Sequence, residues 1–183
     1  MQTKNSRVLA RAVEAVVFLF AAFSGFLTGI APPEEAAQFS VGAAAMLALC
    51  LFLFISIHWK KKPRPRERRL WLVLAGSLML VAAIAGLSYR YNLDVLTFAY
   101  PPDYPTSRYF AGTQYTPEAS SLADKEGLSA GQVVAKFGGL PNRHLVWNAR
   151  SVERARLILV TNYLIFALSI AGTVFSLVEL KTR

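Results

Sequence analysis

The stretch that decides the fold reads His58-Trp59-Lys60-Lys61-Lys62-Pro63-Arg64-Pro65-Arg66-Glu67-Arg68-Arg69. Seven of its residues are Lys or Arg, and a long apolar run stands on each side of it. Short loops rich in Lys and Arg resist transfer across a membrane and so orient the helices that flank them. We therefore expect a membrane protein in which residues 60–69 form a basic cytoplasmic loop.

Four apolar runs carry most of a composition that is 54% hydrophobic over 183 residues. Crossing about 30 Å of hydrocarbon requires about 20 mostly apolar residues, and each run supplies them. With their polar flanks, the runs predict transmembrane helices over residues 12–31, 39–59, 70–91 and 154–179. The predicted fold is an all-α, four-helix membrane bundle.

Charge on the remaining segments orients the chain. Lys and Arg occur in residues 1–11 and 180–183, whereas residues 32–38 contain two acids and no base. Both termini are therefore expected in the cytoplasm of a multi-pass protein of the cell inner membrane. Residues 32–38 form a short external loop, and residues 92–153 form a small, mostly helical extracytoplasmic segment between the third and fourth helices.

A cleaved signal peptide is the alternative for the first run. Gly29-Ile30-Ala31 resembles a cleavage site, but Pro32 directly after it argues against cleavage. We therefore expect residues 12–31 to remain as a helix.

Two groups of residues are predicted to act within or beside the membrane. Helices in lipid associate through small residues and interhelical hydrogen bonds, which Thr161 and Asn162 could supply. The small residues at helical spacing are Ala21, Gly25, Gly29, Ala82, Gly86, Ala167 and Ala171. The residues expected to fix topology and contact lipid headgroups are Lys60, Lys61, Lys62, Arg64, Arg66, Arg68 and Arg69.

The outward segment is the part in which a specific function is expected. Residues 100–115 are rich in Pro, Tyr and Gly, which predicts an extended, turn-rich chain. Thr116-Pro117-Glu118 and Ser129 are helix-start signals that predict helices over 117–126 and up to Phe137. The candidate external contact surface comprises Tyr100, Tyr104, Tyr109, Tyr115, His144 and Trp147.

Motifs for catalysis are lacking. The single cysteine, Cys50, excludes an intramolecular disulfide, and the two histidines fall on opposite sides of the predicted membrane. The sequence contains no HExxH, CxxC or GxSxG motif. The remaining alternatives are a carboxylate pair of Asp94 and Asp103, and a triad of His144 and Asp124 with Ser120, Ser121 or Ser151. We expect no catalytic residue, no metal and no cofactor.

The net charge of +9 is concentrated around the second loop, so we do not expect a nucleic-acid partner. The leading hypothesis is a membrane interaction or accessory protein, such as a subunit, scaffold or anchor, with lipids and a protein partner or second copy as its contacts. The alternatives are an oligomeric membrane-permeabilising effector or channel subunit, and a membrane enzyme acting on lipid or envelope substrates.

Overall fold

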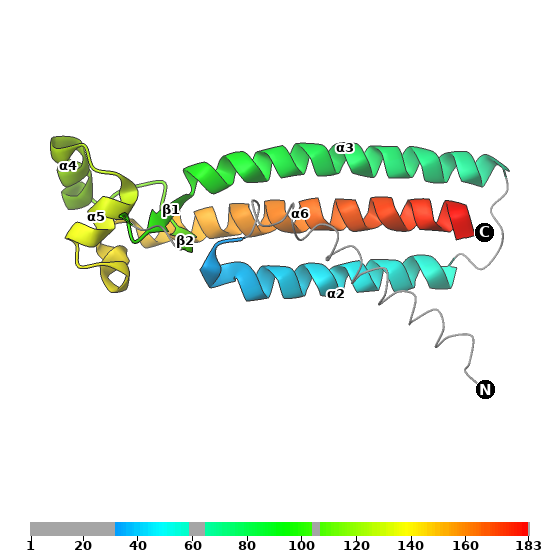
Figure 1. The fold of residues 1–183 in the computed structure, drawn as a ribbon, viewed down its shortest axis with the longest axis horizontal. Coiled ribbons are helices and arrows are strands. Elements are labelled where there is room, and N and C mark those ends of the chain that lie inside the picture. The colour runs from blue at the N-terminus through cyan, green and yellow to red at the C-terminus, as the bar shows by residue number, and fades with distance from the viewer. Residues whose placement is uncertain (1–31, 59–64, 104–106, 183) are drawn as a thin grey trace, which may run out of the picture. The chain divides into compact units, whose positions relative to one another are not determined.

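The computed structural model describes residues 32–58, 65–103 and 107–182, and most of these are helical. In chain order the elements are α2 (Glu34–His58), α3 (Pro65–Val95), β1 (Thr97–Tyr100), β2 (Ser107–Phe110), α4 (Pro117–Glu126), α5 (Ala130–Lys136), the 3-10 helix η1 (Leu140–Leu145) and α6 (Ala149–Thr182) (Figure 1). The predicted helix over residues 12–31 lies outside the described residues, together with its packing candidates Ala21, Gly25 and Gly29.

Within the described residues, three helices are long and apolar enough to cross a membrane. Their apolar stretches are Glu34–Phe54, Arg68–Val95 and Ala149–Leu177. At 1.5 Å per residue, the 28 residues of the second stretch extend over about 42 Å, more than the hydrocarbon thickness of about 30 Å. The chain therefore has the helices of a membrane protein.

The long helices extend beyond the apolar runs that predict them. The expectation that residues 32–38 form a loop is wrong, because α2 begins at Glu34. Glu34 and Glu35 follow two prolines, and acids in a first helical turn interact favourably with the helix dipole. Hydropathy marks the apolar part of a helix and misses such a polar first turn.

The structure divides into two compact units, each with its own packing. One, the helical unit, includes Phe39–Leu87 and Tyr163–Arg183. The other, which we call the cap unit, consists of Pro32–Gln38 and Ser88–Asn162.

Within the helical unit, α2, α3 and α6 contribute to a shared apolar cluster. Ala48, Trp71, Ala171 and Phe175 are buried together, and the rings of Phe52 and Phe175 meet edge to face at 4.9 Å. Because three helices supply these residues, the cluster holds the helices side by side (Figure 1).

The small residues predicted to mediate packing take different positions. Ala82 is buried with Ala85 and Phe166, and Ala171 belongs to the cluster around Trp71. A Cβ added at Gly86 would lie 3.0 Å from Cε2 of Phe166, so the two residues are in close contact. Ala167 is half-buried.

The cap unit contains a two-stranded antiparallel sheet, of which β2 lies in the stretch 100–115 that is predicted to be an extended, turn-rich chain. Thr97 pairs with Phe110 and Tyr100 with Ser107. Thr and aromatic residues favour strands, and the proline after Tyr100 cannot donate to a ladder, so β1 ends there. The fold is mostly helical with one hairpin, not purely α-helical.

Candidate functional site

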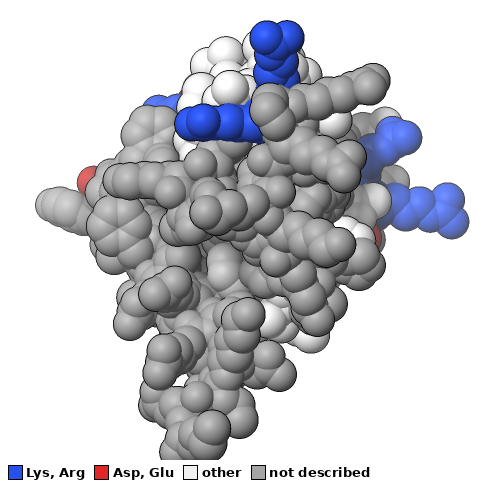
Figure 2. Space-filling view, turned by 90° about the vertical axis from the view of Figure 1, so that its right-hand side faces the viewer, with Lys and Arg blue, Asp and Glu red and all other residues white. Residues whose placement is uncertain are grey.

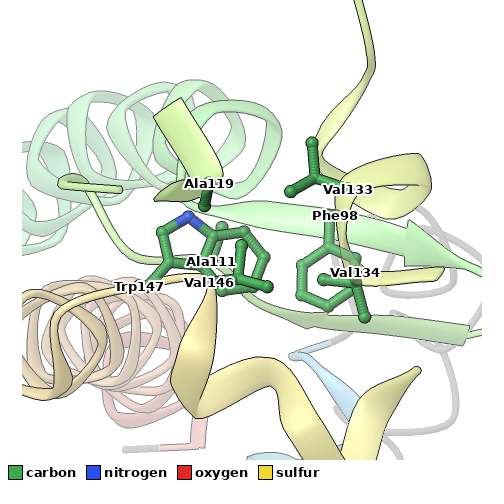
Figure 3. Close-up of a cluster of buried hydrophobic side chains, with 7 residues drawn as sticks. All are labelled: Phe98, Ala111, Ala119, Val133, Val134, Val146 and Trp147. Carbon is green, nitrogen blue, oxygen red and sulfur yellow. The ribbon is translucent and has the colours of Figure 1, made fainter. Parts of the chain in front are cut away.

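The cap unit is built around one buried tryptophan, Trp147, which is 1% exposed. Its indole packs on the Phe98 ring from β1 with a centroid separation of 5.0 Å (Figure 3). Further apolar residues from the hairpin, α4, α5 and the segment after η1 complete the cluster, namely Ala111, Ala119, Val133, Val134 and Val146. Because these side chains come from separate elements, their packing fixes the cap as one body.

Two glycines permit this packing. A Cβ at Gly112 would lie 2.4 Å from Ser151 Oγ and 2.6 Å from Trp147 Cβ. A Cβ at Gly131, in α5, would lie 2.7 Å from the carbonyl oxygen of Ala99. Real Cβ atoms do not approach other heavy atoms this closely, so both contacts require glycine.

The two short helices of the cap begin and end at local signals, as predicted. Thr116 Oγ1 accepts a hydrogen bond from the Ala119 N–H at 3.4 Å, and Gly127, with φ of 63°, closes α4. At the start of α5, Gln132 Oε1 accepts from the Ser129 N–H at 2.9 Å. These caps satisfy amide groups that a helix end leaves unpaired.

Tyr115 contacts the buried core of the cap unit and is itself partly exposed. Its ring stacks on Trp147 with centroids 5.8 Å apart and planes inclined by 22°, yet the residue is 38% exposed. The Thr116 N–H and Oγ1 donate to the carbonyls of Val146 (2.9 Å) and Leu145 (2.7 Å), respectively. The segments that carry Tyr115 and the 47%-exposed Leu145 therefore lie together.

We call Tyr115, His144 and Leu145 the Tyr115 surface. All three are exposed, and His144 and Leu145 end η1. Burial of part of the ring raises the pKa of the Tyr115 phenol above its ordinary value. The surface combines an aromatic ring with a fixed orientation, a leucine and an imidazole, which are groups suited to contact with another molecule.

Acids in the first turn of α2 hold that turn against the rest of the cap unit. Glu35 forms an ion pair with Arg143 of η1, and Glu34 Oε2 accepts a hydrogen bond from the Tyr109 hydroxyl at 3.3 Å. Burial lowers the pKa of the Arg143 guanidinium, and the like charge of Arg156 acts in the same direction. Arginine nevertheless stays protonated in proteins, so the ion pair persists at neutral pH.

The predicted contact residues are only partly at the surface. Tyr115 and His144 are exposed, and Tyr100 and Tyr109 are half-buried. Trp147 is a core residue, contrary to its expected place on the contact surface, because the cap has an apolar core that its indole fills. Tyr104 lies outside the described residues.

The residues considered for catalysis are not assembled into a site. Asp94 pairs with Arg108 at 3.0 Å and with Arg90 at 3.6 Å. Nδ1 of His144 lies 3.2 Å from the carbonyl oxygen of Pro141, whereas Ser151 Oγ donates to the carbonyl of Asn148 at 2.8 Å. In the described part of the chain, no group of three His, Cys, Asp or Glu side chains could hold a metal.

The basic loop is described only at its end. Arg66, Arg68 and Arg69 lie in the first two turns of α3, where Arg68 and Arg69 are exposed. Figure 2 faces the end at which α3 begins and shows Lys and Arg side chains at the edge of that surface. The predicted headgroup contacts Lys60, Lys61, Lys62 and Arg64 fall outside the described ranges.

The polar pair Thr161 and Asn162 of α6 has an interhelical contact. Asn162 Nδ2 donates to Ser88 Oγ of α3 at 3.4 Å, while Thr161 is exposed. The amide thus has a partner on another helix.

Comparison with known proteins gives no relative from which a function could be transferred. No family model, no curated protein and no solved structure matches the chain.

Proposed function

We propose that this protein is a multi-pass membrane protein that acts by contact, as a subunit, scaffold or anchor of a membrane assembly. The single observation that carries this proposal is the Tyr115 surface. A tyrosine and a leucine remain exposed beside a tryptophan that the cap core holds in place. Aromatic anchors with a fixed geometry lose little conformational entropy on binding, which favours recognition of a partner.

The proposed orientation follows from charge. The seven Lys and Arg residues of the loop over residues 60–69 support a cytoplasmic position for that loop, and the bases in residues 1–11 and 180–183 support the same side for both termini. The cap unit then faces the outside of the cell inner membrane. In this proposal the apolar sequence of residues 12–31, which lies outside the described residues, supplies one further span.

The test is native mass spectrometry of the particle purified from native membranes in mild detergent. We expect a complex with a protein partner or a second copy. The double variant Tyr115→Ala/Leu145→Ala should reduce that complex at least about tenfold, because truncating the hot-spot residues of an interface costs about 2 kcal/mol or more. The matched control is Leu87→Ala/Tyr91→Ala, which truncates a leucine and a tyrosine that are 74% and 70% exposed on α3.

Recovery of a strict monomer would refute the proposal, as would equal loss of the complex in both double variants. A homo-oligomer of fixed number that conducts ions would instead favour the permeabilising effector or channel subunit. The membrane-enzyme hypothesis would be favoured if the protein turned over a lipid or envelope substrate and if Asp94→Ala, Asp103→Ala or His144→Ala abolished that activity.

A further inference from the structure

Uncompensated positive charge lies at the beginning of α6, directly before its apolar run. Arg150, Arg154 and Arg156 are exposed, and none of them forms an ion pair within the described residues. Between Ala149 and Arg156 the only acid is Glu153, so three bases and one acid leave a charge of +2. Arg156 also faces a cation, since its charge acts on Arg143.

One face of α6 changes from basic to apolar within a short distance. Arg150, Arg154, Leu157, Ile158 and Thr161 are exposed and recur at the spacing of one helix face. Leu157 is 66% exposed and Ile158 is 37% exposed. Arg150 and Leu157 are seven positions apart, which corresponds to a rise of about 10 Å along the helix axis.

The opposite face of the same turns of α6 is buried. Ser151, Ala155 and Leu159 are buried, and the last two have no more than 1% of their surface exposed. The exposed face therefore has a fixed orientation, because the buried face prevents rotation of the helix about its axis. Both guanidinium groups stand one turn apart on the free side.

We propose that this face binds an anionic phospholipid, with its phosphate held by Arg150 and Arg154 and its acyl chain lying on Leu157 and Ile158. Guanidinium groups match phosphate oxygens in geometry and charge. Leu157 and Ile158, one to two turns further along α6, are suited to contact with an acyl chain. A free phosphate has no acyl chain, so this contact distinguishes a phospholipid from free phosphate. This proposal rests on the membrane insertion of α6 in the proposed function.

The experiment counts lipids that remain bound to the full-length protein by native mass spectrometry. The protein is equilibrated in micelles with equal amounts of phosphatidylglycerol and phosphatidylcholine. We compare wild type, Arg150→Gln/Arg154→Gln and the control Lys125→Gln/Lys136→Gln, which removes two exposed charges from α4 and α5. Each variant is also tested for membrane insertion by alkaline extraction.

We expect wild type and control to retain phosphatidylglycerol preferentially. In the arginine variant the preference should fall about fivefold for each arginine replaced, which is about 25-fold for both. An unchanged preference in an inserted arginine variant would overturn the lipid site alone. Extraction of wild type as a soluble protein would overturn insertion and the site together. If excess inorganic phosphate displaced the lipid, the acyl chain would contribute nothing to binding, and the proposed contact with Leu157 and Ile158 would be refuted.

Discussion

Glu35 in the first turn of α2 forms an ion pair with Arg143 of η1, 108 positions later in the chain. Both residues belong to the cap unit, so the first turn of α2 is part of the cap's structure. The side chains are 28% and 34% exposed, which leaves the pair partly screened by water.

Removal of this pair should weaken the cap modestly. We expect Glu35→Gln and Arg143→Gln to show a coupling free energy of about 1 kcal/mol in a double-mutant cycle, because exposed pairs contribute no more than that. Thermal unfolding in detergent, followed by tryptophan fluorescence, supplies the four free energies. Strictly additive effects would show that the pair contributes nothing to stability.

Gly112 should tolerate no side chain. A methyl group there meets Ser151 Oγ and Trp147 Cβ, so Gly112→Ala should destabilise the cap by about 1–3 kcal/mol. The control is Gly76→Ala in α3, where nothing lies within 4 Å of the added Cβ. That substitution should leave the unfolding temperature unchanged or raise it, since alanine favours helix. Similar unfolding temperatures for the two variants would contradict the packing around Trp147.

Close packing of α3 on α6 should depend on Gly86. Leucine at this position has no room beside the Phe166 ring, and overpacking typically costs about 1–3 kcal/mol. We expect Gly86→Leu to lower the unfolding temperature and Gly76→Leu to leave it near wild type. If Gly76→Leu proves the more damaging, an interface at the Gly76 face must be sought.

Tyr115 should make the cap sensitive to alkaline pH. Burial raises the pKa of its phenol in the folded state, so the neutral ring favours folding below the unfolded pKa of about 10. This contribution is lost as pH rises through the folded pKa. Tyr115→Phe should therefore show a smaller fall in unfolding temperature from about pH 9 to 11. Identical pH profiles for variant and wild type would refute the assignment.

The sequence predicts those secondary-structure elements that depend on residues close together in the chain. Thr116, Pro117 and Gly127 delimit α4 because capping depends on neighbours within one turn. The apolar runs predict α2, α3 and α6 because the hydrophobic requirement of a membrane span is met within each segment.

Features that depend on distant contacts could not be predicted in this way. From the sequence, Trp147 is predicted to lie on the external contact surface, because its contact with Phe98, some 50 positions earlier, is not evident there. The hairpin has no clear alternating pattern in the sequence, because its strands have four residues each and lie among prolines and tyrosines. Thr97, Phe98 and Tyr100 are nevertheless strand-forming types that could have indicated it.

The position of Trp147 in the chain has a consequence for biosynthesis. Phe98 and the hairpin leave the ribosome about 50 residues before the indole that covers them. Until Trp147 is made, the apolar face of the nascent cap remains uncovered, and such surfaces recruit chaperones and proteases. A product truncated before Trp147 would therefore be marked for degradation by the same side chains that stabilise the complete protein.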